Sequence, residues 1–274
     1  MTQPDRHVSL TPAQRTAYLA RIGVRPPSAP TQEALATLHR AHLMTVPFEN
    51  LDIGVRPIRL DLDGLWAKIV ADRRGGYCYE LNGLLAALLR SVGYAVDLVS
   101  ARVSLAAGGL TPDFDHLALV VRSPDLDGPH LADVGFGDAF IEPIPLRHGF
   151  ARREGRKAVG LVERDGVWAY REDHGEGWMT QYVFTTLPRA LEDFAERNAW
   201  QQTSPQSHFT QQRVTSLATS TGRVTLSDRR LITTAEGQRT EEELTEEQVA
   251  QALDEIFGIS APMTPLGRVT PRRS

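Results

Sequence analysis

The sequence predicts an α+β fold in which helices and strands are segregated along the chain. Helix caps and helical periodicity fill the first third, up to about residue 93. From about residue 95 the period changes to two, as in antiparallel strands with one buried face. The final third mixes short strands with amphipathic helices. The 274 residues are enough for two domains or one elaborated domain, and the composition is that of an ordinary globular protein.

The first third is expected to begin with two capped helices. One starts at Thr11, where Pro12 and Gln14 complete the pattern of a first-turn proline and a capping box. The next starts at Thr31 and ends before Pro47, because the residue that precedes a proline is disfavoured in a helix.

A third helix is expected after the chain's only cysteine, Cys78. Leucines recur at i, i+3, i+4, i+7 and i+8 in this segment, namely Leu81, Leu84, Leu85, Leu88 and Leu89. This spacing produces one apolar face. The helix is expected to end at Gly93, because glycine readily adopts the left-handed conformation that terminates helices.

Short alternating runs predict the strands of the middle third. They are AVDLVSARVSL, HLALVV, HLADV, KAVGLVER and VWAYRED, separated by turns rich in Gly, Pro and Asp. The RDGV stretch at residues 164–167 predicts a tight hairpin. Several strands at this spacing are typical of a barrel or a sandwich.

The final third is expected to begin with a helix around PRALEDFAERNAW, followed by the strands RVTSLAT, RVTLSD and RLITT. A last helix is predicted over TEEQVAQALDEIF, where Thr245 and Gln248 form a capping box. Its apolar face consists of Val249, Leu253, Ile256 and Phe257.

Charge and composition argue against several classes of function. The net charge of −4 does not favour binding to nucleic acid or to an anionic membrane. No apolar run reaches the roughly 18 residues of a membrane span, and MTQPDRHVSL lacks a signal-peptide pattern, so we expect a cytoplasmic protein. A single cysteine excludes an intrachain disulfide and a cysteine-rich metal site, and the histidine pattern indicates no other metal site.

Cys78 lies in the stretch RRGGYCYELNGLL, behind Gly75 and Gly76 and at the start of the third helix. A thiol is a nucleophile only as a thiolate, and the unpaired amides of a helix N-terminus lower the pKa of a thiol. The two glycines let the backbone approach closely, and Arg73 or Arg74 adds positive charge. These features favour a reactive thiol over a structural one that only fills the core.

Among the eight histidines, His116 has the most suitable position to activate this thiol. It begins the run HLALVV, and the next run, HLADV, leads up to Asp133. If these runs form an antiparallel hairpin whose turn is centred in the loop between them, His116 and Asp133 face each other directly. The carboxylate would then orient the imidazole toward Cys78, as in a catalytic triad. The run GFG at residues 135–137 breaks the strand and allows a ligand to approach the backbone.

These residues resemble the arylamine N-acetyltransferase family. The resemblance is carried by four segments, which are VPFENLD, RRGGYCYELNGLL, DHLALVV and ADVGFGDAF. It implies a helical domain at residues 1–93, a β-barrel domain at residues 94–205 and an α/β lid domain at residues 206–274. The first domain would carry the cysteine and the second the histidine and aspartate, in a core like that of cysteine proteases and transglutaminases.

The resemblance also implies an activity. Cys78, His116 and Asp133 would form the triad that transfers an acetyl group from acetyl-CoA to the nitrogen of arylamines, arylhydrazines or N-hydroxyarylamines. The mechanism would be ping-pong, through an acetyl-cysteine intermediate. No cofactor would be bound permanently, because acetyl-CoA serves as a co-substrate and the other partner is a small aromatic amine or hydrazine.

Five further residues are assigned to substrate or CoA binding by the same resemblance, and they are Phe48, Arg74, Phe136, Gly137 and Phe209. Arg74 is expected mainly to support the loop of the site. The phenylalanines are expected near the substrate pocket, although each could instead be a core residue.

Three other functions share parts of this pattern. A cysteine hydrolase or a transglutaminase-like enzyme uses the same triad, so the triad alone does not name the acyl donor. A second alternative is an amide synthase that forms a macrolactam, an activity found in the family that this sequence resembles. A binding module with an incidental thiol would show ordinary thiol reactivity.

Overall fold

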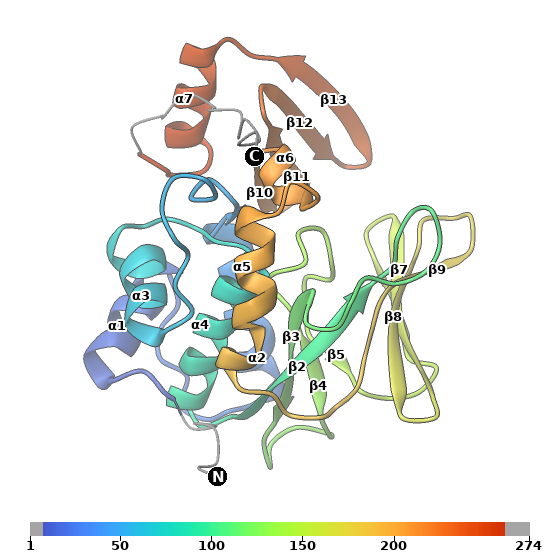
Figure 1. The fold of residues 1–274 in the computed structure, drawn as a ribbon. Coiled ribbons are helices and arrows are strands. Elements are labelled where there is room, and N and C mark those ends of the chain that lie inside the picture. The colour runs from blue at the N-terminus through green and yellow to red at the C-terminus, as the bar shows by residue number, and fades with distance from the viewer. Residues whose placement is uncertain (1–7, 261–274) are drawn as a thin grey trace.

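The computed structural model describes residues 8–260. Figure 1 shows a group of helices on one side of a large sheet, and a smaller sheet with a helix above both. The predicted α+β class is confirmed, with helices first, a large antiparallel sheet next and a mixed last third. In the described part of the chain, no helix is long and apolar enough to cross a membrane.

The helices of the first third are α1 (Pro12–Arg21), α2 (Gln32–Thr45), α3 (Leu62–Trp66), the π-helical turn η1 (Ala67–Ala71) and α4 (Cys78–Ser91). Three of them, α1, α2 and α4, begin where the sequence predicts, whereas α3 and the turn η1 were not predicted. The side chains of Thr11 and Thr31 accept hydrogen bonds from the first turns of α1 and α2, and Gln14 completes the capping box. Gly93 follows α4 with a φ of +101°, as expected of a left-handed stop.

Helix α4 is the central helix of the molecule. Its residues from Cys78 to Leu89 are all buried, including those outside the predicted leucine face. A helix that is covered on all sides must lie between other elements, and α4 packs on α1, on α3 and on two strands of the large sheet, β2 and β3. Cys78 at its first turn is therefore held in a rigid and enclosed part of the fold.

The large sheet has eight antiparallel strands in the order β5-β4-β3-β2-β9-β8-β7-β6, and it curls on itself like half of a barrel (Figure 1). The strands are β2 (Ala95–Val103), β3 (His116–Arg122), β4 (His130–Ala132), β5 (Ile144–Pro145), β6 (Ala151–Glu154), β7 (Lys157–Arg164), β8 (Val167–Asp173) and β9 (Trp178–Phe184). Arg164 pairs with Val167, so the RDGV hairpin is confirmed. The sequence did not predict β5, β6 and β9.

The register of β3 and β4 corrects one prediction. Leu119 pairs with Ala132, so the alignment is two residues away from the one that would place His116 directly opposite Asp133. Asp133 lies just beyond the end of β4. The centre of the turn still lies in the loop, but one position later than that pairing requires, because the loop geometry sets the register. A shift by two keeps each side chain on its face of the sheet, so His116 and Asp133 still lie on the same face as diagonal neighbours.

The last third contains a second sheet in the order β1-β10-β11-β12-β13. Its strands are β1 (Phe48–Glu49), β10 (Val214–Thr219), β11 (Gly222–Ser227), β12 (Arg230–Ala235) and β13 (Gln238–Glu243), and it is accompanied by η2 (Leu191–Phe194), α5 (Ala195–Thr203), α6 (His208–Gln211) and α7 (Glu246–Glu255). Phe48 of β1 pairs with Ser216 of β10, so the first and last thirds share one sheet.

Three apolar cores correspond to this layout. One lies between the helices and the large sheet, one lies inside the curled sheet, and one lies between the second sheet and α7. The first core includes Leu84 of α4 and Leu119 of β3, so it crosses the expected boundary between the first two domains. The three domain ranges stay a prediction, and their ends at residues 1–7 and 261–274 lie outside the described residues.

Candidate active site

The two glycines before Cys78 are required by close backbone packing. Gly76 forms a parallel bridge with Phe48, and a β-carbon on Gly75 would lie 1.9 Å from the carbonyl oxygen of Pro47. No side chain fits in that space. The VPFENLD segment and the segment before α4 are thereby held side by side, and Cys78 becomes the first residue of the helix.

A third glycine brings the GFG loop against the cysteine. A β-carbon on Gly135 would lie 2.6 Å from the α-carbon of Cys78, so only glycine permits this approach. The side chain of Cys78 is buried but borders a pocket. The thiol is therefore neither sealed in the hydrocarbon core nor freely exposed.

His116 and Asp133 form a buried pair, with Nε2 of His116 2.7 Å from Oδ2 of Asp133. Burial by itself lowers the pKa of His116, but the Asp133 carboxylate and the sulfur of Cys78 outweigh burial and raise this pKa to about 10. Burial raises the pKa of Asp133, yet His116, the Asn82 amide and the Gly135 N–H lower it to a net value below the usual range. The pair is therefore ionised, and Nδ1 of His116 is the nitrogen left for Cys78.

Asn82 holds this pair in place, and the sequence analysis assigned it no role. Its amide nitrogen donates to Oδ1 of Asp133 at 2.8 Å and to the carbonyl of Leu117 at 2.6 Å. Its amide oxygen accepts the N–H of Val134 at 2.9 Å. The sequence did contain a signal for this role. Asn82 is four residues after Cys78, and residues four apart on a helix lie on the same face.

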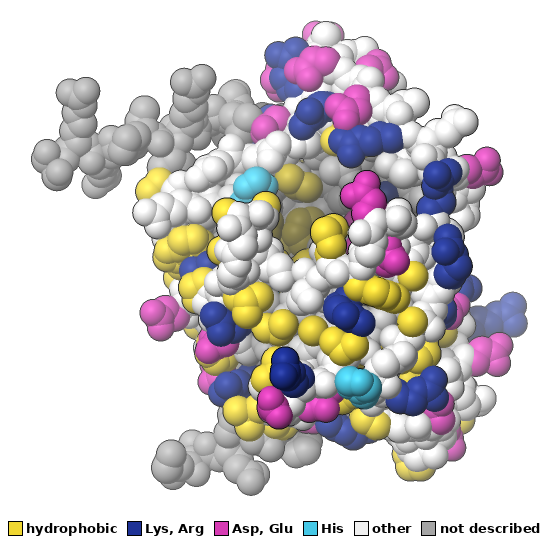
Figure 2. Space-filling model, turned by 90° about the vertical axis from the view of Figure 1, so that its right-hand side faces the viewer, with side chains coloured by type: hydrophobic (Ala, Val, Ile, Leu, Met, Phe, Trp, Pro, Cys, Tyr) yellow, Lys and Arg dark blue, Asp and Glu magenta, His cyan; other side chains and the backbone are white. Residues whose placement is uncertain are grey.

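A pocket of about 460 Å³ opens beside Cys78 and His116. Its wall includes three of the residues assigned to binding, Phe48, Phe136 and Phe209. Figure 2 shows a hollow on one face of the molecule with hydrophobic side chains inside it. A pocket of this size, with a mainly apolar wall and a few polar groups, suits a small and largely apolar molecule.

The aromatic rings of the pocket also contact one another. The Phe209 ring centroid lies 6.1 Å from that of Phe48 and 5.5 Å from that of Tyr77, and Phe136 meets the imidazole of His116 edge-on at 5.1 Å. Such offset contacts restrict the orientation of each ring. Phe136 is thus positioned by the histidine that it borders.

Comparisons with known proteins show the family to which the chain belongs. The family model described as N-acetyltransferase matches residues 31–264. An arylamine N-acetyltransferase of Mycolicibacterium smegmatis is 36% identical over 251 residues, which is 88% of this chain and 90% of the relative. This chain belongs to the arylamine N-acetyltransferase family.

Solved structures of arylamine N-acetyltransferases have the same fold. The Nocardia farcinica enzyme superposes with a TM-score of 0.85 at 36% identity and covers 96% of this chain and 95% of its own. The Mycobacterium marinum enzyme, solved in complex with CoA, superposes with a TM-score of 0.83 at 31% identity and covers 89% and 92%. Both likenesses include all three parts of the fold.

The polar rim of the pocket includes Arg197 and Gln201, which neither the motifs nor the family resemblance singled out. Arg197 approaches the Asp115 carboxylate to 2.5 Å, and Gln201 donates to the same oxygen at 2.8 Å. The Arg197 guanidinium also lies 3.7 Å above the Trp200 ring. The charge of Asp115, next to His116, is therefore neutralised, and the pocket offers an apolar wall with little net charge.

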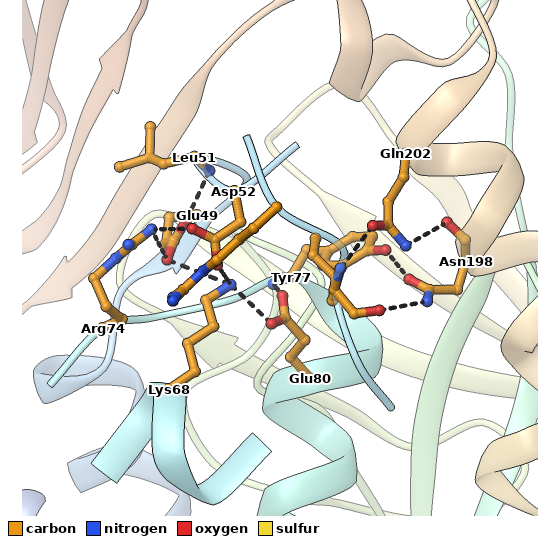
Figure 3. Close-up of polar contacts among 11 residues, drawn as sticks. Glu49, Leu51, Asp52, Lys68, Arg74, Tyr77, Glu80, Asn198 and Gln202 are labelled. Carbon is orange, nitrogen blue, oxygen red and sulfur yellow. Dashed lines mark hydrogen bonds and ion pairs between the residues drawn. The ribbon is translucent and has the colours of Figure 1, made fainter. Parts of the chain in front are cut away.

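Arg74 and Gly137 are not part of the pocket wall formed by the described residues. Arg74 instead binds Glu49 at 2.9 Å and Asp52 at 3.1 Å, beneath the VPFENLD segment (Figure 3). Gly137 has a φ of +90°, a conformation that glycine adopts without strain, and it turns the chain directly after Phe136.

Arg74 is one member of a buried charge cluster, which comprises Glu49, Asp52, Lys68, Arg74 and Glu80 (Figure 3). The Lys68 ammonium lies 2.8 Å from a Glu80 oxygen and 3.1 Å from an Asp52 oxygen. The other Glu80 oxygen accepts the N–H of Tyr77 at 3.1 Å, so the cluster caps the N-terminus of α4. Burial raises the pKa of Glu80 to about 7, although Lys68 opposes this shift.

No group of three His, Cys, Asp or Glu side chains within residues 8–260 is arranged to hold a metal ion. His39 and His42 of α2, three residues apart, are both buried and make separate hydrogen bonds.

Proposed function

We propose that this protein transfers acetyl groups from acetyl-CoA to the nitrogen of arylamines, arylhydrazines or N-hydroxyarylamines, with Cys78, His116 and Asp133 as its catalytic triad. The ionised His116–Asp133 pair beside Cys78 at the floor of an apolar pocket carries this proposal. Membership of the arylamine N-acetyltransferase family and the CoA complex of a relative support the choice of donor and acceptor. Acetyl-CoA acts as a co-substrate, with no permanently bound cofactor.

The first half-reaction loads the acetyl group on the protein. The Cys78 thiolate attacks the thioester carbonyl carbon and forms a tetrahedral intermediate. The intermediate collapses with cleavage of the bond to the CoA sulfur, and the imidazolium of His116 gives its proton to the departing thiolate. Acetyl-Cys78, neutral His116 and free CoA thiol result. Because one thioester replaces another, the site mainly has to orient the groups and stabilise the intermediate.

The second half-reaction returns the protein to its starting state. The amine nitrogen attacks the acetyl carbon of acetyl-Cys78, and His116 accepts the proton that this nitrogen loses. Collapse of the intermediate releases the N-acetylated product and the Cys78 thiolate. The His116 imidazolium forms again beside the Asp133 carboxylate, which stabilises it.

The remaining assigned residues have supporting roles in this proposal. Phe48, Phe136 and Phe209 contact the aromatic ring of the acceptor, since they border the pocket that contains Cys78. Gly137 directs Phe136 into the pocket through its turn. Arg74 holds the VPFENLD segment from below. A cytoplasmic location, and the absence of nucleic-acid and membrane partners, stay predictions.

Incubation with acetyl-CoA alone tests the proposal. We expect one acetyl group per chain, located on Cys78 by mass spectrometry, and one equivalent of released CoA. Addition of anilines and hydrazines should then restart CoA release, and Cys78→Ser should abolish both steps because an alkoxide is far harder to form than a thiolate. A peptidase would not be acetylated, a thioester hydrolase would release acetate continuously without amine, and a macrolactam-forming amide synthase would ignore the small acceptors. Any of these results would contradict the proposal.

A further inference from the structure

His39 of helix α2 is buried against the segment that follows Asp133. Its Nε2 accepts the backbone N–H of Asp133 at 3.0 Å, and its Nδ1 donates to the backbone carbonyl of Ile141 at 2.8 Å. Its ring also stacks on Phe140, with centroids 5.5 Å apart and planes 8° apart. One imidazole therefore binds both ends of the segment 133–141.

These two hydrogen bonds determine the state of the ring. A nitrogen that accepts an N–H cannot carry a proton, so His39 is neutral with its proton on Nδ1. Burial lowers the pKa of His39, although the Ile141 carbonyl and the carboxylates of Asp133 and Glu154 oppose this effect. The ring has no free polar atom and cannot exchange protons with the pocket.

The segment between these two anchors forms part of the candidate active site. Gly135 touches the backbone of Cys78, and Phe136 borders both the pocket and the His116 ring. The side chain of Asp133 is held by Asn82 and His116, whereas its backbone N–H is held by His39. The position of the carboxylate thus depends on a residue that lies outside the pocket wall.

We propose that His39 is a positioning residue, which sets the backbone of Asp133 so that the carboxylate keeps His116 protonated and directed at Cys78. This inference rests on the proposed function, because it assigns His39 a role in the same triad. His39 touches no substrate and takes no part in proton transfer.

The neighbouring His42 provides the contrast within the same helix. It is equally buried, but its Nδ1 bonds the Tyr18 hydroxyl at 2.7 Å, on the side of α1. Its Nε2 has no hydrogen-bond partner among residues 8–260. His42 therefore contributes to packing between helices and makes no hydrogen bond to the 133–141 segment.

Three variants separate positioning from packing. His39→Leu removes both hydrogen bonds, whereas His39→Gln can place its side-chain oxygen near the position of Nε2 and keep an acceptor for Asp133. His42→Gln is the control, because it changes the same residue type at an equally buried position of the same helix. The full chain is used for all three, with two readouts, which are single-turnover acetylation by acetyl-CoA and the pH dependence of iodoacetamide alkylation of Cys78.

We expect His39→Leu to slow acetylation by about 10- to 100-fold, since small displacements of catalytic groups have effects of this size. The midpoint of alkylation should move to higher pH, as we also expect for His116→Ala, because a thiolate forms less readily without a cation beside it. His39→Gln should recover most of the rate, and His42→Gln should leave both readouts near the wild-type values. If His39→Leu does not fold, His39→Asn replaces it, because Asn keeps a donor for Ile141 but is too short to reach Asp133.

The proposal is overturned if His39→Leu lowers only the melting temperature and leaves both readouts unchanged, or if His39→Gln and His42→Gln are impaired as much as His39→Leu. Failure of the proposed function looks different, because the wild-type chain would then not be acetylated by acetyl-CoA. The alkylation profile needs no acyl donor, so it tests His39 in either case.

Discussion

The two sides of the first turn of α4 are stabilised in different ways. On one side, a single ion pair, His116 with Asp133, is surrounded by the neutral groups of Asn82 and His39. On the other side, the buried charge cluster brings two cations, Lys68 and Arg74, among three carboxylates. Both sides hold residues close to Cys78, but only one of them faces the pocket.

This difference corresponds to what each side does in the proposed reaction. His116 loses its proton and regains it within one cycle, so its supports must not compete for that proton, and neutral amides and a neutral imidazole satisfy this condition. No residue of the cluster borders the pocket that residues 8–260 form, so none takes part in the proposed proton transfers. The charges of the cluster can therefore act as fixed anchors for the VPFENLD segment and for the start of α4.

Neutralising the carboxylate of the pair should have the largest effect. Asp133→Asn is expected to slow single-turnover acetylation of Cys78 by roughly 10³- to 10⁴-fold, because His116 loses the partner that orients it and raises its pKa. Asp97→Asn is the control. Asp97 of β2 forms an ion pair with Arg122, which lies at the opposite end of β3 from His116. Equal rates for wild type and Asp133→Asn would show that the pair is not part of the reaction.

Breaking the charge cluster should lower the stability of the fold more than the rate of acetylation. Lys68→Met leaves three buried carboxylates without their shared cation, and we expect a loss of about 3–5 kcal/mol in the free energy of unfolding by urea. The acetylation rate of the folded fraction should change much less than in Asp133→Asn. An unchanged unfolding midpoint, or a rate loss as large as that of Asp133→Asn, would contradict this division of roles.

The raised pKa of His116 makes stability depend on pH. In the unfolded chain the pKa returns to about 6.5, so the native state binds the extra proton between pH 6.5 and about 10. The stabilisation is complete below pH 6.5 and is lost as the pH rises through 10, by an amount of the order of a few kcal/mol.

Urea unfolding of wild type and His116→Gln over this pH range measures the effect. Glu80, whose pKa rises from 4.5 to about 7, changes stability in the same direction at lower pH, but both proteins contain it. The difference between the two curves therefore reports on the ion pair of His116 and Asp133. Parallel curves for the two proteins would refute the ionised pair.

Removal of Arg56, an exposed arginine that binds one member of the buried charge cluster, should have the smallest effect. Arg56 binds Asp52 at 2.9 Å, but 47% of its side chain is exposed. Arg56→Ala is expected to change the free energy of unfolding by no more than about 1 kcal/mol, as for other solvent-exposed ion pairs, and to leave acetylation unchanged. A loss comparable to that of Lys68→Met would mean that burial does not explain the strength of the cluster.

Local sequence patterns were sufficient for the elements whose signals lie within a few residues. The caps at Thr11, Thr31 and Thr245 start their helices as predicted, because a side chain three residues away satisfies the free N–H groups of a first turn. Strand β13 was missed since QRTEEE has no apolar alternation, and all six of its residues are exposed on a sheet edge.

The motifs also pointed to the residues that we propose to react, since Cys78 and His116 border one pocket and Asp133 bonds His116. Their supports could not be found in this way. His39 bonds a backbone group 94 positions further along the chain, and Asn82 bonds Asp133 across 51 positions. The sequence by itself thus determined which residues we propose to react and where the capped helices begin. The tertiary structure alone decided the β3–β4 register and the hydrogen bonds that hold the site, because both depend on how distant segments pack.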